Sequence, residues 1–302
     1  MRRPRCGTTL AELLVALAVG GTALGLIAAI SIREQRAFND LAAVASSDAA
    51  LRDAGSLLPI DLRPLAPAAG DIRAGEARDT SLELRATIAS AVVCDTTTTE
   101  LILAPSGQGS AAYGSIAATI EAGDTAWLYS AGDTTDEWHP FRIAETSEAA
   151  AAPCAALAPR LSDDDKALPR VVVGLNASLV LSSAVGLPLR ITRPRRYSLY
   201  RASDGLSYLG ERDWNPEAVR FNTIQPVSGP FAPAGEHGLV FRYLDSAGAS
   251  LPIPVTNPGA IALIQVDLRA KARNAVRAPG NGAILGEHAD SAAIVVFLHN
   301  RR

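Results

Sequence analysis

The chain has 302 residues and a formal net charge of −3. This length provides a real core for one large domain or two small ones, and the nearly balanced charge gives no signal of nucleic-acid binding. The sequence contains no GxSxG, HExxH, Walker or dinucleotide-binding motif, so nothing in it indicates an enzyme.

The first forty residues combine a basic leader with a long apolar run. Three arginines precede Gly7, and the run from Leu10 to Ile32 contains Glu12 as its one ionisable residue. At about 1.5 Å per helical residue, this run is long enough to cross a bilayer core of about 30 Å. The basic leader places the N-terminus in the cytoplasm. Glu12 either has a function inside the membrane or lies near enough to the end of the span to reach the interface.

The residues around Gly7 carry a resemblance to a known family. The sequence Gly-Thr-Thr-Leu-Ala-Glu-Leu-Leu-Val-Ala, Gly7 to Ala16, resembles the class III signal of type IV prepilins and type II secretion pseudopilins. The resemblance implies that a prepilin peptidase cleaves after Gly7 and that the same enzyme, a methyltransferase, N-methylates Thr8, where the family usually has Phe. The acid that the family carries five residues into the mature chain is then Glu12.

The resemblance also implies an assembly role for Glu12. Cleavage leaves a positive amine on Thr8, and in a fibre of staggered parallel helices that amine can meet Glu12 of another subunit. In a water-poor core such a pair attracts strongly, and either charge alone is costly.

Two other interpretations of this region remain open. One is a secretory signal peptide that is cut after the apolar run, where Ala28 and Ala29 are among several small residues. The other is an uncleaved signal anchor that holds an exported enzyme or binding protein. The length of the run, its acid and the helical sequence that continues beyond it favour the pilin-like interpretation.

The helix is expected to continue from the membrane span to Leu58, because Pro59 and Pro64 follow. It carries two apolar stripes beyond the span. The first consists of Phe38, Leu41, Ala42, Ala45 and Ala49, and the second of Val44, Leu51 and Leu58. Two stripes fit a helix that packs on its own sheet and on neighbours in a fibre, or one that is simply buried in its own domain.

Cysteine and histidine usage indicates a disulfide and no metal site. Cys6 would be lost with the leader, and the remaining pair in an exported domain, Cys94 and Cys154, is expected to form a disulfide, the alternative being two buried thiols. We expect no metal and no cofactor, because there is no CxxC motif and the histidines are scattered. They are His139, His237, His288 and His299.

The rest of the chain predicts a β-rich head with mostly antiparallel strands. The expected strands are 82–93, 101–104, 126–130, 141–144, 171–173, 178–181, 189–192, 197–201, 206–209, 239–245, 261–270 and 293–298. The Asp204–Gly205 pair predicts a hairpin turn, and residues 145–169 and 226–238 are expected to be loops.

Several polar and aromatic groups receive structural interpretations. Asp163, Asp164 and Asp165 are expected on a solvated loop, since they lack the spacing of an EF-hand. The arginines 193, 195 and 196 are expected at a solvated strand end. His139 is expected in a polar turn between strands, and Trp127, Trp138 and Trp214 are expected to be core or interface residues.

Together these features predict an α+β protein: a leader at 1–7, a helix at 8–58 that crosses the membrane at about 10–32, and an exported head at 59–302. The order of its C-terminal strands resembles that of PilW-type minor pilins. The resemblance implies a non-enzymatic structural subunit that joins, and initiates or caps, a type IV pilus (fimbrium) or secretion pseudopilus. Its partners would be the prepilin peptidase, other pilin or pseudopilin subunits and the assembly platform of the inner membrane, where the chain would be a single-pass protein before incorporation.

Overall fold

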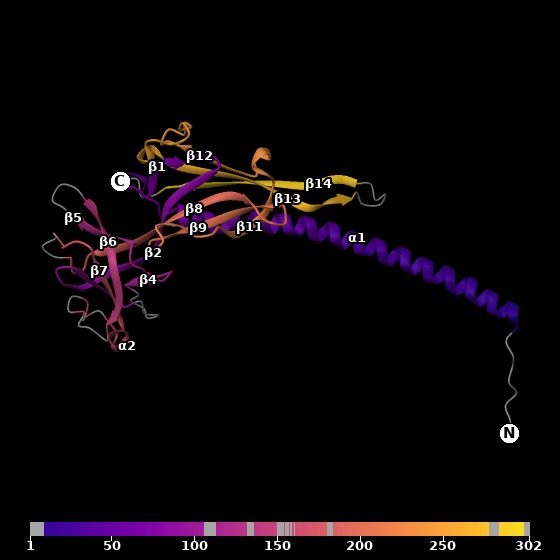
Figure 1. The fold of residues 1–302 in the computed structure, drawn as a ribbon, viewed down its shortest axis with the longest axis horizontal. Coiled ribbons are helices and arrows are strands. Elements are labelled where there is room, and N and C mark those ends of the chain that lie inside the picture. Colours follow the sequence, from indigo (N-terminus) through magenta and orange to yellow (C-terminus); the bar gives the residue numbers. More distant parts are fainter. Residues whose placement is uncertain are drawn as a thin grey trace, which may run out of the picture.

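The computed structural model shows an α+β fold with one long apolar helix and a large antiparallel sheet (Figure 1). It describes residues 9–105, 113–131, 136–149, 154, 157, 159, 161–179, 184–277 and 284–298. Gly7, Thr8 and Cys6 therefore lie outside the described residues. The helix extends away from the head, and its first turn lies at the far end from the strands.

The long helix, α1, runs from Leu10 to Leu62 without a break. Its 53 residues correspond to a length of about 80 Å. The predicted end at Leu58 is wrong by one turn, because the helix continues through Pro59. Proline removes a single backbone hydrogen bond there, and the burial of Leu58 and Leu62 against the sheet holds the last turn in place. The N–H of Arg63 then donates to the carbonyl of Pro59 at 3.1 Å.

The strands form one connected antiparallel system in which β8 lies at the centre and pairs with β2, β5 and β9. The strands are β1 (Ile72–Ala77), β2 (Ser81–Thr96), β3 (Glu100–Leu103), β4 (Gly114–Ile116), β5 (Thr125–Ala131), β6 (Asp136–Ala149), β7 (Arg170–Leu175), β8 (Pro188–Arg201), β9 (Ser207–Asn215), β10 (Arg220–Phe221), β11 (Gln225–Phe231), β12 (Leu239–Leu244), β13 (Leu263–Arg277) and β14 (Ile284–Phe297). The short helices are α2 (Asp163–Ala167), η1 (Pro67–Ala69), η3 (Ala234–Glu236) and η4 (Pro258–Ala260).

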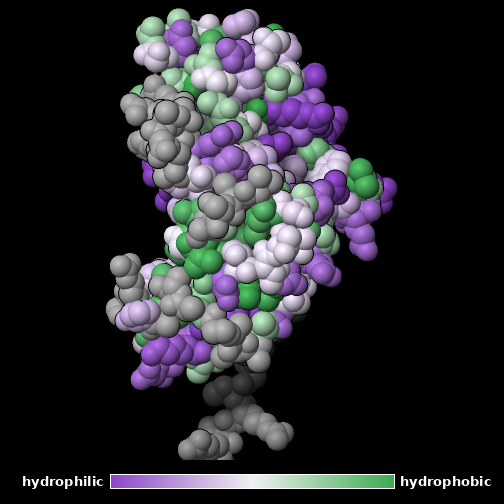
Figure 2. All heavy atoms as spheres, turned by 90° about the vertical axis from the view of Figure 1, so that its left-hand side faces the viewer, coloured by the Kyte–Doolittle hydropathy of each residue, from purple (hydrophilic) through white to green (hydrophobic). Residues whose placement is uncertain are grey.

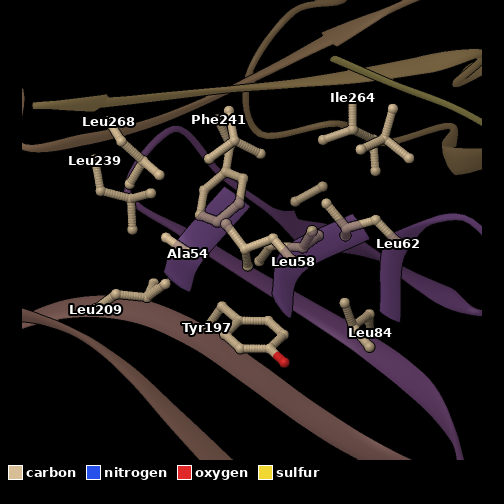
Figure 3. Close-up of a cluster of buried hydrophobic side chains, with 14 of the residues drawn as sticks. Ala54, Leu58, Leu62, Leu84, Tyr197, Leu209, Leu239, Phe241, Ile264 and Leu268 are labelled. Carbon is tan, nitrogen blue, oxygen red and sulfur yellow. The ribbon is translucent and has the colours of Figure 1, made fainter. Parts of the chain in front are cut away.

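The head contains two lobes with separate cores. In the helix lobe, the buried face of α1 packs against β11, β13 and β14, and Leu58 lies in a core with Tyr197, Leu209 and Phe241 (Figure 3). The distal lobe is formed by the segment 88–187, which runs from the second half of β2 to the residue before β8. It has its own apolar clusters, one of which also includes Leu189 and Ile191 of β8. It lies at the opposite end of the molecule from the first turns of α1 (Figure 1).

Most of the predicted strands are present, and several are longer than predicted. The expected strands 189–192 and 197–201 are one strand, β8, that runs through Pro194. Proline is tolerated because the neighbour on that side changes there, from β5 at Thr192 to β9 at Arg195. Similarly, β6 extends to Ala149, so it occupies the start of the expected loop 145–169.

Two other local predictions are wrong. The expected loop 226–238 begins with strand β11, whose pairing with β9 is irregular around Ser228, and these shifts accommodate the prolines. Residues 178 and 179 are not in a strand, and the rest of the expected strand 178–181 lies outside the described residues. The predicted turn at Asp204–Gly205 joins β8 to β9, and Gly205 adopts a positive φ of 81° there.

Candidate functional site

The first turn of α1 holds Glu12 in a reciprocal cap with Thr9. Thr9 is the N-cap residue, and its hydroxyl oxygen accepts a hydrogen bond from the N–H of Glu12 at 3.4 Å. In return, Glu12 Oε2 accepts from the N–H of Thr9 at 3.0 Å and from its hydroxyl at 3.2 Å. The carboxylate is thus stabilised by the positive end of the helix. The two hydrogen bonds that the Glu12 carboxylate accepts both use Oε2, which leaves Oε1 available to another donor.

The segment Leu10–Ile32 is apolar on all sides apart from Glu12, and every residue in it is exposed. Exposed fractions of its large apolar side chains run from 80% at Leu10 to 49% at Ile32. The helix is long and apolar enough to cross a membrane. A segment that is hydrophobic all round needs an apolar surrounding, so this half of α1 fits a single-pass membrane anchor.

Beyond the span, the two predicted stripes of α1 have different environments. Leu51 and Leu58 of the second stripe are buried in the helix lobe, with Val44 half-buried. The first stripe stays open: Phe38 is 71% exposed and Leu41 is 67% exposed. The helix therefore offers an apolar face to solvent after it has left the bilayer.

The end of α1 is attached to the sheet by a polar cluster that the sequence did not reveal. Asp61 Oδ2 accepts hydrogen bonds from Arg195 Nη1 at 2.7 Å and from the Tyr197 hydroxyl at 2.6 Å. Arg195 also contacts Asp213 at 2.8 Å and Glu211 at 3.5 Å. We call Asp61, Arg195, Tyr197, Glu211 and Asp213 the helix clamp.

Burial and charge shift the ionisation of the helix clamp. Burial lowers the pKa of Arg195, but its hydrogen bond to Asp213 and the charge of Asp61 outweigh this effect and raise it. Burial, together with Asp61, raises the pKa of the Tyr197 hydroxyl. Burial also raises the pKa of Glu211, against the opposing charge of Arg195. The clamp therefore contains a fixed cation and one carboxyl that binds its proton more tightly than usual.

The expectation that arginines 193, 195 and 196 form a solvated strand end is wrong. All three lie inside β8 and pair with carboxylates from other segments. Arg193 is buried and binds Asp124 through two nitrogens at 2.8 Å. Arg196 pairs with Glu83 on β2. These arginines connect β8 to neighbouring segments, and Arg193 and Arg195 each bind one aspartate through two nitrogens. A run of arginines in the sequence does not show whether its charges are paired or solvated.

Cys94 and Cys154 are joined by a disulfide in the distal lobe, with their Cα atoms 4.9 Å apart. Both residues are buried beside Leu157 and Leu161. The bridge closes a sequence separation of 60 residues, and loop entropy predicts a stabilisation of about 4 kcal/mol. It connects β2 to the segment before α2.

The remaining candidates of the sequence occupy structural positions. His139 lies within β6, where its strand partner is Leu128, so the expected turn is wrong. Trp127 is a core residue whose ring lies beneath Arg85 and Arg190. The three aspartates form the start of α2 and not a loop, and Asp165 is buried against Ser162. Within the described part of the chain, no group of three or more His, Cys, Asp and Glu residues is arranged to hold a metal ion.

Comparison with known proteins gives no further assignment. No family model matches the chain, and no match is found among curated proteins or among solved structures.

Proposed function

We propose that this chain is a minor pilin or pseudopilin, a structural subunit that enters a type IV pilus or a secretion pseudopilus after its leader has been removed. The proposal combines the resemblance of residues 7–16 to prepilin signals with the form of α1. A single continuous helix would supply both the membrane anchor and the surface by which subunits pack. The head would lie outside the inner membrane.

The observation that carries the proposal is the exposed apolar stripe after the membrane span. Phe38 and Leu41 lie about 9 and 13 Å along the helix from Ile32, which is beyond a headgroup layer of roughly 6 Å. A simple anchor has no need for exposed Phe and Leu side chains in water. Neighbouring helices in a fibre would cover them.

The Thr9–Glu12 cap suggests how an unassembled subunit keeps its acid inside the membrane. The carboxylate is held by donors of its own first turn while the chain is in the bilayer. On assembly, the amine of a neighbouring Thr8 would provide a stronger, fully charged partner. The exchange would favour fibre entry without leaving the acid unpaired at any stage.

Mass spectrometry of the protein purified from cells that contain a prepilin peptidase tests this proposal. We expect the loss of residues 1–7 and a methyl group on the amine of Thr8. The matched control is Gly7→Leu, which should keep its leader, because the peptidase requires the glycine in the family that the signal resembles. An intact Met1, or a cut near Ala29, in the unmodified chain would contradict the proposal and support an anchor or a signal peptide.

A further inference from the structure

The distal lobe differs from the rest of the molecule in charge. Its segment, 88–187, contains twelve Asp and Glu residues against four Lys and Arg residues, a formal charge of −8. The whole chain carries −3, so the remainder carries +5. Figure 2 faces this end of the molecule and shows hydrophilic residues interspersed with apolar ones. A lobe with this charge attracts cations and repels anions over about a Debye length.

A cleft of about 630 Å³ lies where this lobe meets the turn between β9 and β10. Its walls come from four places in the chain: the turn before β5, strand β6, the residue after β7 and the β9–β10 turn. The polar residues that line it are Glu121, Arg142, Asn176, Asn215 and Glu217. The two lobes therefore build the cleft together.

Gly123 brings the two sides of the cleft into contact. It has a positive φ of 95°, and a Cβ atom at this position would lie 2.2 Å from the Cβ of Pro216. The close approach fixes the β9–β10 turn against the distal lobe. The two sides of the cleft are therefore in direct contact at Gly123 and Pro216.

The polar groups of the cleft fit a polypeptide with a basic side chain. Glu121 is about half exposed at 52%, although it also lies 3.3 Å from Arg193, and Glu217 is exposed and forms no ion pair with any described residue. These carboxylates suit an ammonium or guanidinium group. Arg142 is exposed and, within the described chain, has no carboxylate partner, so its guanidinium is available to a peptide carbonyl. Asn215 is already bonded to Ala218 and Asn222.

We propose that this cleft binds a lysine- or arginine-bearing segment of a partner protein, which the acidic lobe attracts from a distance. A free polyamine would use the carboxylates but would leave Arg142 facing another cation. An anion would use Arg142 but would be repelled by the lobe. A basic peptide satisfies both sets of groups, and its binding does not require assembly into a fibre.

The test measures the binding of labelled peptides to the full-length protein in lipid nanodiscs by fluorescence anisotropy. The probe is acetyl-Gly-Gly-Lys-Gly-Arg-Gly-Gly-amide, with a Gln/Asn peptide and a Glu/Asp peptide of the same length for comparison. We expect only the basic peptide to bind. The double variant Glu121→Gln with Glu217→Gln should lower its affinity about tenfold, and Arg142→Gln about threefold, in line with partly exposed interface charges.

A matched pair of charges in the same lobe but outside the cleft provides the control. Asp163→Asn with Asp164→Asn removes the same charge and should change the affinity less than about twofold. An equal loss in both double variants would overturn the assignment to the cleft. Equal binding of the neutral peptide, or tighter binding of spermidine than of the basic peptide, would overturn the proposed class of ligand. An unchanged urea unfolding transition, followed by tryptophan fluorescence, verifies that each variant is folded.

Discussion

The two halves of α1 belong to one helix, but their apolar side chains are covered in different ways. In the C-terminal half, Leu58 and Leu62 are fully buried, because the strands of the same chain cover them. In the N-terminal half, every residue of Leu10–Ile32 is exposed. A helix whose first half cannot be covered by its own chain depends on another molecule, either lipid or a neighbouring subunit.

The segment of α1 between these halves shows which side of the helix the head covers. It lies outside the expected bilayer core, yet Phe38 and Leu41 remain exposed while Ala43 and Ser47 on the other face are buried. The sheet therefore covers one side of the helix and leaves the other side open. Under the proposed function, this open side is the part of the head-proximal helix that neighbouring subunits cover.

The largest expected effect is the loss of fibre entry in Glu12→Ala. Removing one member of a buried charge pair costs about 3–5 kcal/mol, because the other charge is left unpaired. We therefore expect at least about a hundredfold less of this variant in sheared fibres than of the unmodified chain. Quantitative immunoblotting of fibre and membrane fractions measures this ratio.

Glu34→Ala is the matched control for Glu12→Ala. Glu34 is an exposed acid of the same helix, just beyond the expected span. Its removal should leave the fibre fraction within about twofold of the unmodified chain, since exposed charges contribute little. Normal fibre entry of Glu12→Ala would refute the role of this acid in assembly.

The second prediction compares the same leucine-to-alanine truncation at a buried and at an exposed position of α1. Leu58→Ala should lower the free energy of unfolding of the head by about 3 kcal/mol, because it leaves a cavity in the helix lobe. Leu41→Ala should change it by less than about 0.5 kcal/mol, since this side chain is exposed. Urea unfolding in detergent, followed by tryptophan fluorescence, measures both values.

Fibre entry of the Leu41→Ala variant tests whether neighbouring subunits cover the exposed side of α1. If neighbouring subunits cover the open stripe, Leu41→Ala should reduce fibre entry several-fold at nearly unchanged head stability. A variant that is as stable and as well incorporated as the unmodified chain would show that the open stripe is not a subunit interface.

The periodicity of apolar residues is sufficient to predict helices and strands that are determined by their own local sequence. The apolar run, the helix beyond it and strands such as β2, β12 and β13 follow from the spacing of their own side chains. The two stripes of α1 could also be recognised, but the sequence could not say which one the sheet covers. That depends on where β11, β13 and β14 pack, which is a long-range property.

The failures have a common physical origin in pairing partners that are distant in sequence. Pro59 is interpreted as the end of the helix, and residues 189–192 and 197–201 as two separate strands. Packing accommodates Pro59, and a change of neighbouring strand accommodates Pro194 within β8. The arginines of β8 looked like solvated charge because their acids come from other strands. Asp61 and Arg195 are 134 residues apart, so no local pattern indicates the helix clamp.

The third prediction concerns the polar attachment of the buried half. Asp61→Asn keeps the shape of the side chain but removes the charge that binds Arg195 and Tyr197. We expect a loss of about 2 kcal/mol of head stability, as for other hydrogen bonds to charged groups. Asp53→Asn, an exposed position on the same helix, should cost less than about 0.5 kcal/mol. Equal effects in the two variants would mean that the clamp adds nothing to the attachment of α1.

The smallest expected effect is a pH-dependent gain in Glu211→Gln. Because burial raises the pKa of Glu211, the folded head holds this proton more tightly than the unfolded chain does. Its contribution to stability is thus greatest below the unfolded value of about 4.3 and falls as the pH rises to the raised value of the folded state.

A glutamine resembles the protonated acid and keeps a side-chain oxygen that can accept from the Tyr197 hydroxyl, which donates to Glu211 Oε2 at 3.2 Å. We expect Glu211→Gln to gain up to about 1 kcal/mol relative to the unmodified head at pH 7 and nothing at pH 4. Glu217→Gln, exposed and outside the clamp, should show the same difference at both pH values. A loss of stability at pH 7 would mean that the ionised carboxylate is needed by Arg195, and that the buried half of α1 is held by a fully charged cluster.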